Sequence, residues 1–207
     1  MKNNPRSRDA TKQETRAALI QAGLLEFFER GLDVPSLDAI CARAGFTRGA
    51  FYVHFRDRDE FVVAVMDTVL GAFLDVIIAT DSADADLAQT ILRFASALID
   101  GNSLLGEQGE MRLHQLLDAC ARSEPIRRQI IATIGEGIRR VERAASNGQV
   151  AKTVRGDVES APLAAVLVAL ALGLLQMFEF GMKLELQEIR ATVLRLVGPT
   201  GSTRRKT

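Results

Sequence analysis

The stretch GFTRGAFYVHF, from Gly45 to Phe55, decides the fold of the first part of this chain. Gly45 supplies a turn, and Thr47 has the short hydroxyl side chain of a helix N-cap. The residues after it form a short helix that carries an arginine, a tyrosine and a histidine. Another short helix, from about Ser36 to Ala44, precedes the turn, with Ser36 as its expected N-cap. The pattern predicts two helices that cross at a tight turn.

The polar side chains of this unit have the chemistry of a DNA-binding surface. Free amides and the dipole at a helix start favour an anion, so Thr47 and the amides after it form a candidate phosphate site. Arg48 is placed to reach base edges, where a bidentate contact with guanine is the commonest specific pairing. Gly49 has no side chain and allows the helix backbone to approach DNA closely. A merely solvated helix face is the alternative interpretation, and spacing alone leaves the choice open.

Three further residues are expected to hold this surface on the DNA backbone. Tyr52 follows Arg48 by one helical turn, and its hydroxyl and the His54 ring are predicted to contact phosphates. Such contacts position a reader and carry no base information. Arg58 lies in the first turn of the next helix, where the helix dipole disfavours a cation, so a phosphate partner would explain it.

Charge is sorted along the chain, although 26 basic and 26 acidic residues make it neutral as a whole. Residues 1–20 and 41–58 each carry a net charge of +3, whereas residues 61–110 carry −7. Net charge alone argues for no partner, but two basic segments around the predicted helix pair favour a polyanion there.

The stretch from Gly31 to Phe61, GLDVPSLDAICARAGFTRGAFYVHFRDRDEF, resembles the helix-turn-helix region of the tetracycline-repressor (TetR) family of bacterial regulators. The resemblance implies that Arg48 faces bases and that Thr47, Tyr52, His54 and Arg58 contact phosphates. Ser36 is a further candidate DNA-binding residue. Cys41 stands where alanine is usual in the family, and Arg58 where lysine is common. The positions that carry the resemblance are Gly31, Ser36, Ile40, Ala44-Gly45, Thr47-Arg48-Gly49, Tyr52, His54-Phe55 and Arg58.

The fold class expected for the whole chain is all-α, because apolar residues recur at three- and four-residue spacing and prolines are few. We expect a helix-turn-helix DNA-binding domain with a basic N-terminal arm at residues 1–58. A larger helical domain for ligand binding and dimerisation is expected at 59–198, and a disordered basic tail at 199–207. A first helix is expected to start at the capping box Thr11–Glu14 and to end at Gly31. Later helices are expected from the box at 57–60 to about 80, and at about 84–100, 110–121, 125–146, 161–181 and 186–197.

The last two helices are the candidate dimer interface. A two-fold symmetric DNA operator is bound by two copies of a helix-turn-helix unit, so the protein is expected to dimerise. The segment 161–181 is apolar around most of its circumference, as expected if it meets both the chain's own core and a second copy. In the family that the chain resembles, the corresponding helices form a four-helix bundle with their symmetry mates. The candidate interface residues are Leu163, Val166, Leu170, Gly173, Leu174, Met177, Ile189, Val193 and Leu196.

The middle helices are expected to enclose a cavity for a small effector. Polar groups within an apolar pattern are typical of such sites, which makes His114 and Gln176 the sharpest candidates. Plain core packing is the alternative interpretation for each residue. The full set of candidates is Phe73, Phe94, Leu98, Met111, His114, Leu117, Ile134, Gln176 and Phe180.

Other classes of function are disfavoured. Cys41 and Cys120 are isolated and the two histidines are scattered, so we expect no metal, no cofactor and no catalytic constellation. The polar N-terminus predicts no signal peptide, and a cytoplasmic location is expected. The apolar run 161–178 suggests a membrane span, but it is uninterrupted only as far as Gln176, and Glu179 follows. A buried helix is therefore preferred.

The sequence therefore predicts a ligand-responsive, homodimeric DNA-binding regulator, most simply a repressor that a fairly hydrophobic effector releases from its double-stranded operator. A helical-bundle enzyme and an activator without a small ligand are the alternatives.

Overall fold

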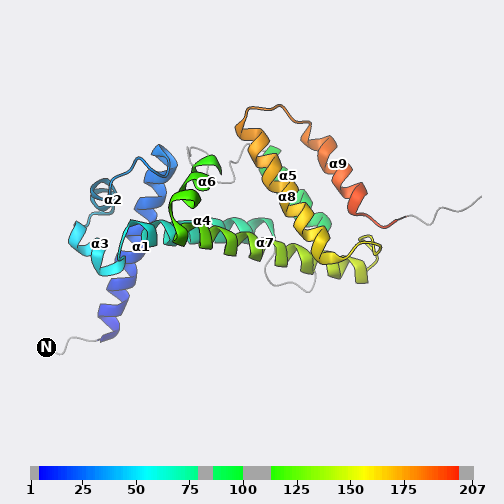
Figure 1. Ribbon diagram of the computed structural model, residues 1–207. Coiled ribbons are helices and arrows are strands. Elements are labelled where there is room, and N and C mark those ends of the chain that lie inside the picture. Colours follow the sequence, from blue (N-terminus) through cyan, green and yellow to red (C-terminus); the bar gives the residue numbers. More distant parts are fainter. Residues whose placement is uncertain (1–4, 79–85, 100–112, 201–207) are drawn as a thin grey trace, which may run out of the picture. The chain divides into compact units, whose positions relative to one another are not determined.

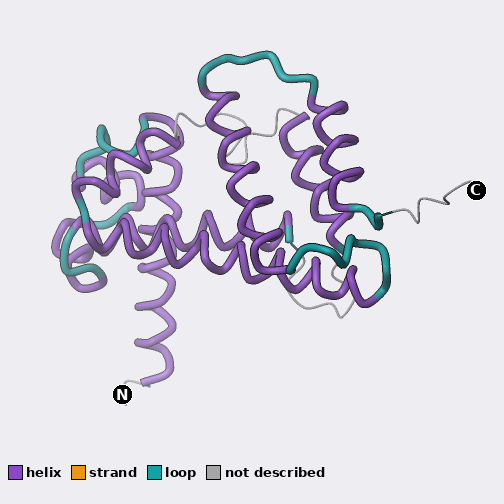
Figure 2. The backbone as a smooth tube through the Cα atoms, turned by 45° about the vertical axis from the view of Figure 1, so that its right-hand side comes forward, coloured by secondary structure: helices purple, strands orange, loops and turns teal. Residues whose placement is uncertain are grey.

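The computed structural model describes residues 5–78, 86–99 and 113–200, and its regular structure is entirely helical (Figures 1 and 2). This confirms the all-α prediction. The ligand candidate Met111 and the tail after residue 200 lie outside the described residues. The helices are α1 (Pro5–Arg30), α2 (Leu37–Ala44), α3 (Arg48–His54), α4 (Arg58–Ile77), α5 (Leu87–Ile99), α6 (Leu113–Arg122), α7 (Glu124–Val150), α8 (Ser160–Glu179) and α9 (Leu186–Val197).

The start of α1 corrects one prediction. The helix begins at Pro5 and not at Thr11, and the Thr15 hydroxyl donates to the Thr11 carbonyl inside it, at 3.0 Å. Proline suits a first helical position because its missing N–H has no partner there in any case. The end of the helix agrees with the prediction, since Gly31 takes a φ of +79° and its N–H donates to the Phe27 carbonyl at 2.9 Å. From residue 5 onward, the predicted basic arm is therefore helical.

The chain divides into two compact units that do not follow sequence order. The first comprises residues 1–71 and 105–131, and the second residues 72–104 and 132–207. Helix α6 belongs to the first unit, where Arg122 donates to both carboxylate oxygens of Asp33 at 2.7 Å. The hydroxyl of Ser123 donates to the Asp59 carboxylate at 2.6 Å. A domain boundary at residue 58 remains a prediction.

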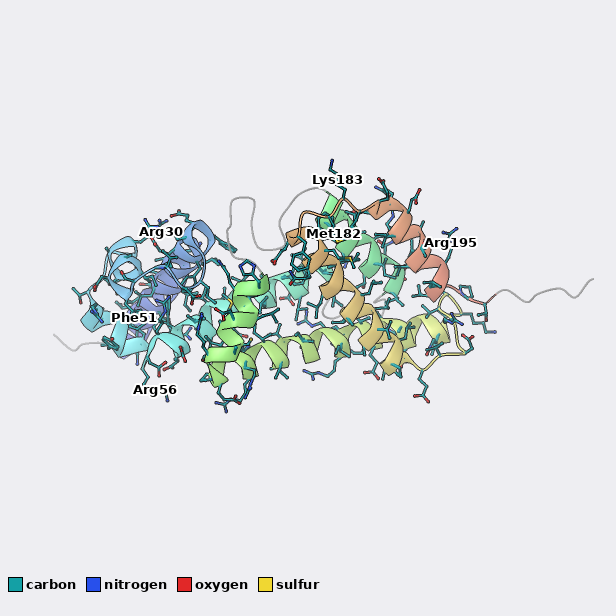
Figure 3. The ribbon with its side chains drawn as sticks, turned by 45° about the horizontal axis from the view of Figure 1, so that its top comes forward. Arg30, Phe51, Arg56, Met182, Lys183 and Arg195 are labelled. Carbon is teal, nitrogen blue, oxygen red and sulfur yellow. The ribbon has the colours of Figure 1, made fainter. Side chains whose placement is uncertain are left out.

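The core of the first unit is an aromatic cluster of Phe27, Phe51, Phe55 and Phe61, each at most 1% exposed. Ring centroids of Phe51 lie 5.2 Å from both Phe55 and Phe61, and the pair with Phe61 has the edge-to-face geometry that favours attraction. Leu19 and Ile40 complete this core from α1 and α2. Figure 3 shows Phe51 within the helices of this unit, while Arg56 points away from them. On α1, Leu19 and Ile20 take the inward positions of their turn, and Ala17 is exposed.

The second unit has its own core, in which α5 packs against α9. Leu87 and Ala144 are fully buried there, and Val197 closes the core from the end of α9. Phe73 and Phe94 pack against this core with half-buried rings. The aliphatic composition of the unit follows the sequence, which has few aromatic residues after residue 94.

Helix α8, predicted to be buried, is largely uncovered in a single copy of the chain. Only Ala164 and Leu174 of its residues are buried, whereas Val166 is 65% exposed. Among the described helices, α8 alone is long and apolar enough to cross a membrane by length and composition, with a mean hydropathy of 2.2 and 17% of that window buried. One face packs against the core of the second unit through Leu163, Leu167 and Val168, and, the two buried residues apart, the other apolar residues are half-buried or exposed in a single copy.

Candidate DNA-binding site

Two side-chain N-caps fix the starts of α2 and α3, the helix pair of the candidate DNA-binding surface. The amide of Ala39 donates to the Ser36 hydroxyl oxygen at 3.2 Å, and the amide of Ala50 donates to the Thr47 hydroxyl oxygen at 3.3 Å. Gly45, with a φ of +76°, makes the turn between them. Both predicted N-caps are confirmed. Each cap leaves other first-turn amides of its helix without an intrahelical partner, which is the arrangement that binds anions.

Arg48 lies exposed on α3 and is oriented by its neighbours. Its Nε lies 3.6 Å from a carboxylate oxygen of Asp38, on the first turn of α2. A hydrogen bond to Tyr52, and then the charge of Asp38, raise the pKa of Arg48 above its ordinary value, so the guanidinium stays charged. Arg48 and Tyr52 thus form one polar surface, as their spacing predicts. An exposed ion pair of this kind is weak and leaves the arginine able to change partners.

His54 lies at the end of α3, close to the cations of α1. Burial and the positive charges of Lys12 and Arg16 lower the pKa of His54, so the ring is neutral near pH 7. The Arg16 guanidinium stands over the Phe55 ring, 5.1 Å from its centroid, which holds that side chain at this end of the unit. The positive charge near the end of α3 therefore comes from Lys12 and Arg16 of α1.

Stability should depend on pH through His54. Because its folded-state pKa lies below the unfolded value, its contribution is present above the unfolded pKa and lost as the pH falls through the folded pKa. We expect the melting temperature of the wild type to fall more on mild acidification than that of His54→Gln. Thermal melts of the two proteins from neutral to mildly acidic pH measure the difference. Identical pH profiles would contradict this role of His54.

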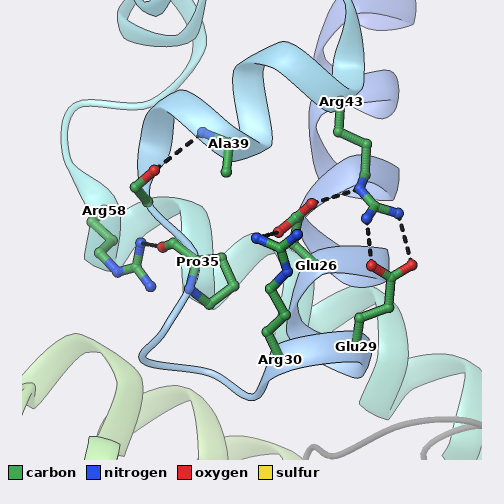
Figure 4. A network of polar contacts seen from close by, with 8 residues as sticks. Glu26, Glu29, Arg30, Pro35, Ala39, Arg43 and Arg58 are labelled. Atoms are coloured by element: carbon green, nitrogen blue, oxygen red, sulfur yellow. Dashed lines mark hydrogen bonds and ion pairs between the residues drawn. The ribbon is translucent and has the colours of Figure 1, made fainter.

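Most of the basic segment 41–58 is paired within the chain. Arg43 donates through Nε to Glu26 at 2.6 Å and through its other nitrogens to Glu29, which ties α2 to α1 (Figure 4). Arg56 pairs with Asp57 at 2.9 Å. Arg43 and Arg58 are therefore directed at other parts of the chain, whereas Arg48 and Arg56 have exposed side chains, and of these two Arg48 lies on α3.

Arg58 differs from the expectation of a phosphate contact. Its guanidinium turns inward, donating to the Pro35 carbonyl at 2.7 Å and to the Leu32 carbonyl at 2.9 Å. It also stands over the Phe27 ring, 5.8 Å from the centroid, and burial lowers its pKa. This geometry accounts for a cation at the start of α4 without any phosphate partner.

Val53 is a candidate contact that the sequence reasoning missed. It is 64% exposed on α3, one turn after Gly49 and beside Tyr52, which is 50% exposed. An apolar side chain on a recognition helix can contact a thymine methyl group. Val53 lies four residues after Gly49, so helical spacing puts both on the same face of α3. This spacing was the signal from which the sequence could have identified it.

The two glycines of this site have different roles. A Cβ at Gly49 would lie 3.6 Å from the Thr47 hydroxyl oxygen, an ordinary contact, so nothing in the fold requires glycine there. A Cβ at Gly45 also meets open space, but its φ of +76° strains any other residue.

We therefore expect Gly45→Ala to lower the free energy of unfolding by about 1–2 kcal/mol, the cost of a left-handed residue with a Cβ. Gly49→Ala is expected to leave it unchanged or raise it by up to ~1 kcal/mol, while weakening DNA binding. Chemical denaturation and DNA titration of both variants test the contrast. A destabilised Gly49→Ala would show that the fold needs this glycine.

The ligand candidates do not fall in one unit. Phe73, Phe94, Leu98, Ile134 and Gln176 lie half-buried in the second unit, where Gln176 donates to Glu179 at 3.4 Å. Other candidates lie on exposed surface, contrary to an enclosed position. His114 and Leu117 face outward from α6, in the first unit, because Leu116 and Ala119 take its inward positions. Phe180 is 74% exposed, just after α8 ends.

The dimer candidates separate into two groups. Leu163 and Val193 pack against the core of the second unit, and Leu174 is buried. Ile189 is half-buried, and a Cβ at Gly173 would meet no atom within 4 Å. The other four candidates are large apolar side chains exposed by 40% or more, namely Val166, Leu170, Met177 and Leu196.

The fold and this surface define a helix-turn-helix protein with the chemistry of DNA binding. Residues 19–65 match the family described as "Bacterial regulatory proteins, tetR family". This segment of the chain therefore matches the tetR family, which confirms the resemblance.

Relatives with assigned names share the N-terminal segment. The HTH-type transcriptional regulator TtgR of Pseudomonas putida is 44% identical over 57 residues, which cover 28% of this chain and 27% of TtgR. The HTH-type transcriptional repressor BepR of Brucella suis is 43% identical over 57 residues, with the same coverage. The matched segment thus spans about a quarter of each relative. Both names describe transcriptional regulators, in agreement with the expectation that the chain is not an enzyme.

Solved structures extend the similarity in fold to most of the chain. The reduced form of Escherichia coli NemR has a TM-score of 0.73 at 21% identity, covering 90% of this chain and all of NemR. The SmeT–triclosan complex has a TM-score of 0.68 at 24% identity, covering 88% of this chain and 89% of SmeT. At these identities the comparison establishes the fold.

Proposed function

We propose that this regulator binds a two-fold symmetric DNA operator as a homodimer and represses transcription until a small, fairly hydrophobic effector releases it. The observation that carries the proposal is the exposed, capped α3, with Thr47 at its start and Arg48 on its outer face. Phosphates would accept from the free amides, and Arg48 would exchange Asp38 for a base edge. Tyr52, His54 and Ser36 remain proposed backbone contacts.

The second part of the proposal is that another copy covers α8. Val166, Leu170 and Met177 make an exposed apolar stripe at helical spacing. Such a stripe on a two-fold axis would meet itself, and Gly173 would allow close approach of the two helices. A bilayer is the other environment that suits this surface, but a DNA-binding unit on the same chain favours a soluble dimer in the cytoplasm.

The third part is the release by an effector. BepR is named a repressor, and SmeT was solved with triclosan, which supports a repressor with a small apolar effector for this chain as well. The candidate contacts that remain are the half-buried Phe73, Phe94, Leu98, Ile134 and Gln176. Helix α4 is the proposed lever, since its residues contribute to both compact units. An effector acts only through its difference in affinity for the two states.

DNA binding is tested by titrating a labelled duplex at several salt concentrations. A DNA-binding regulator should show a log–log slope of affinity against salt of about −0.9 for each phosphate contact. Thr47→Val removes a hydroxyl that caps α3 and is expected to weaken binding to every sequence alike. A flat salt dependence of the wild type would contradict the proposal.

A further inference from the structure

Arg58 occupies a position that joins three parts of the first unit. It is the first residue of α4, and its guanidinium reaches the loop between α1 and α2, more than twenty residues earlier in the chain. The Leu32 carbonyl lies near the start of this loop and the Pro35 carbonyl lies just before the N-cap Ser36. Figure 4 shows Arg58 directed at Pro35, beside the cap of α2.

The physical reason for this arrangement is the planar fork of the guanidinium. Two of its nitrogens donate to two different carbonyls, at 2.7 and 2.9 Å, and its Cζ lies over the Phe27 ring, 5.8 Å from the centroid. Hydrogen bonds from a charged donor are stronger than neutral ones, and partial burial shields them from water. A lysine at the same place has its three donors on one nitrogen and no planar fork, so it cannot direct separate nitrogens at the two carbonyls.

The position of the loop determines where α2 begins. Ser36 follows Pro35 directly and caps α2, whose first turn carries Asp38 against Arg48. A displaced loop would therefore shift both a candidate phosphate site and the partner of the proposed base reader. Misplacement of a binding element by a fraction of its contact distance weakens every contact that it makes.

We propose that Arg58 is a positioning residue that fixes the Leu32–Pro35 segment and the start of α2 for DNA binding, and that it does not bind phosphate. The proposal rests on the DNA-binding function proposed above. It also makes a statement about the free protein, which can be tested without DNA.

The test compares Arg58→Lys with Arg58→Gln, and uses Arg56→Gln as the control for removing an exposed cation. Arg56 is 78% exposed in its side chain and pairs with Asp57. We expect Arg58→Lys and Arg58→Gln to weaken DNA binding on the order of tenfold, at temperatures where both are fully folded, because charge-assisted hydrogen bonds are lost. The salt slope should stay at the wild-type value, and the loss should persist at high salt.

Two results would overturn the proposal. If Arg58→Lys binds like the wild type while the salt slope of Arg58→Gln shrinks by about 0.9 per protomer, Arg58 is a phosphate contact. If both variants melt earlier but bind DNA normally when folded, Arg58 only stabilises the fold.

A measurement on the wild type covers the case of variants that do not fold. The guanidinium resonances of Arg58 should be resolved in the free protein, with slowed rotation of the group, and should not change on addition of duplex DNA. Averaged resonances in the free protein, or a shift on DNA binding, would contradict the proposal. If wild-type protein binds no DNA while these resonances are resolved, the proposed function fails and the anchoring of the loop stands.

Discussion

Phe51→Ala is expected to lower the free energy of unfolding of the first unit by about 3–5 kcal/mol, the range for truncating a fully buried aromatic residue. Phe51 is 0% exposed and contacts Phe55 and Phe61 at 5.2 Å between ring centroids. Its removal would leave a cavity at the point where α3 meets the aromatic cluster. A loss of this size is a large fraction of the total free energy of unfolding of a typical domain. The first unit of the variant should therefore unfold readily.

The chain supplies its own probe for this measurement. Tyr52 is the single tyrosine and there is no tryptophan, so intrinsic fluorescence reports on α3 alone. Chemical denaturation followed at this signal measures the first unit separately from the second. Val53→Ala is the matched control, because Val53 is 64% exposed on the same helix and its truncation should change stability by about 0.5 kcal/mol or less. Equal effects of the two substitutions would show that Phe51 does not anchor α3.

Val166→Glu is expected to convert a dimer into monomers. Val166 is 65% exposed in a single copy, within the apolar stripe of α8. A two-fold axis would place the new carboxylate in the interface twice, and an unpaired buried charge costs about 3–5 kcal/mol. The dissociation constant of the dimer should therefore rise by two orders of magnitude or more, at about 1.4 kcal/mol for each factor of ten.

Sedimentation or light scattering over a range of protein concentrations measures this change. Val150→Glu provides the control, since Val150 is 84% exposed at the end of α7 and lies outside the apolar stripe. It should leave the dimer intact. A monomeric wild type, or a dimer that survives Val166→Glu, would show that α8 is not the interface.

Local signals in the sequence were sufficient to predict where the helices of the candidate DNA-binding surface begin and end. A serine or threonine before an apolar run specifies an N-cap, and Gly31 and Gly45 end their helices because they take positive φ values. These signals depend on residues a few positions apart. The start of α1 was predicted wrongly because Thr11 lies in a helix that already begins at Pro5.

Long-range contacts account for what the sequence could not predict. The role of Arg58 depends on carbonyls at Leu32 and Pro35, and backbone acceptors carry no sequence signature. The apolar spacing of α6 fits more than one inward face, and only packing decided that Leu116 turns inward and Leu117 outward. The apolar composition of α8 could not distinguish burial within the chain from burial against a second copy.

Selection from a random-sequence duplex pool tests most directly whether α3 reads duplex DNA. Wild-type protein should enrich a two-fold symmetric sequence, and Arg48→Ala should lose the preference at one position of each half-site while still binding DNA in a salt-dependent manner. Tyr52→Ala should keep the same enriched sequence with uniformly weaker binding. No enrichment by the wild type over the starting pool, or an unchanged preference in Arg48→Ala, would contradict a role of α3 in reading DNA.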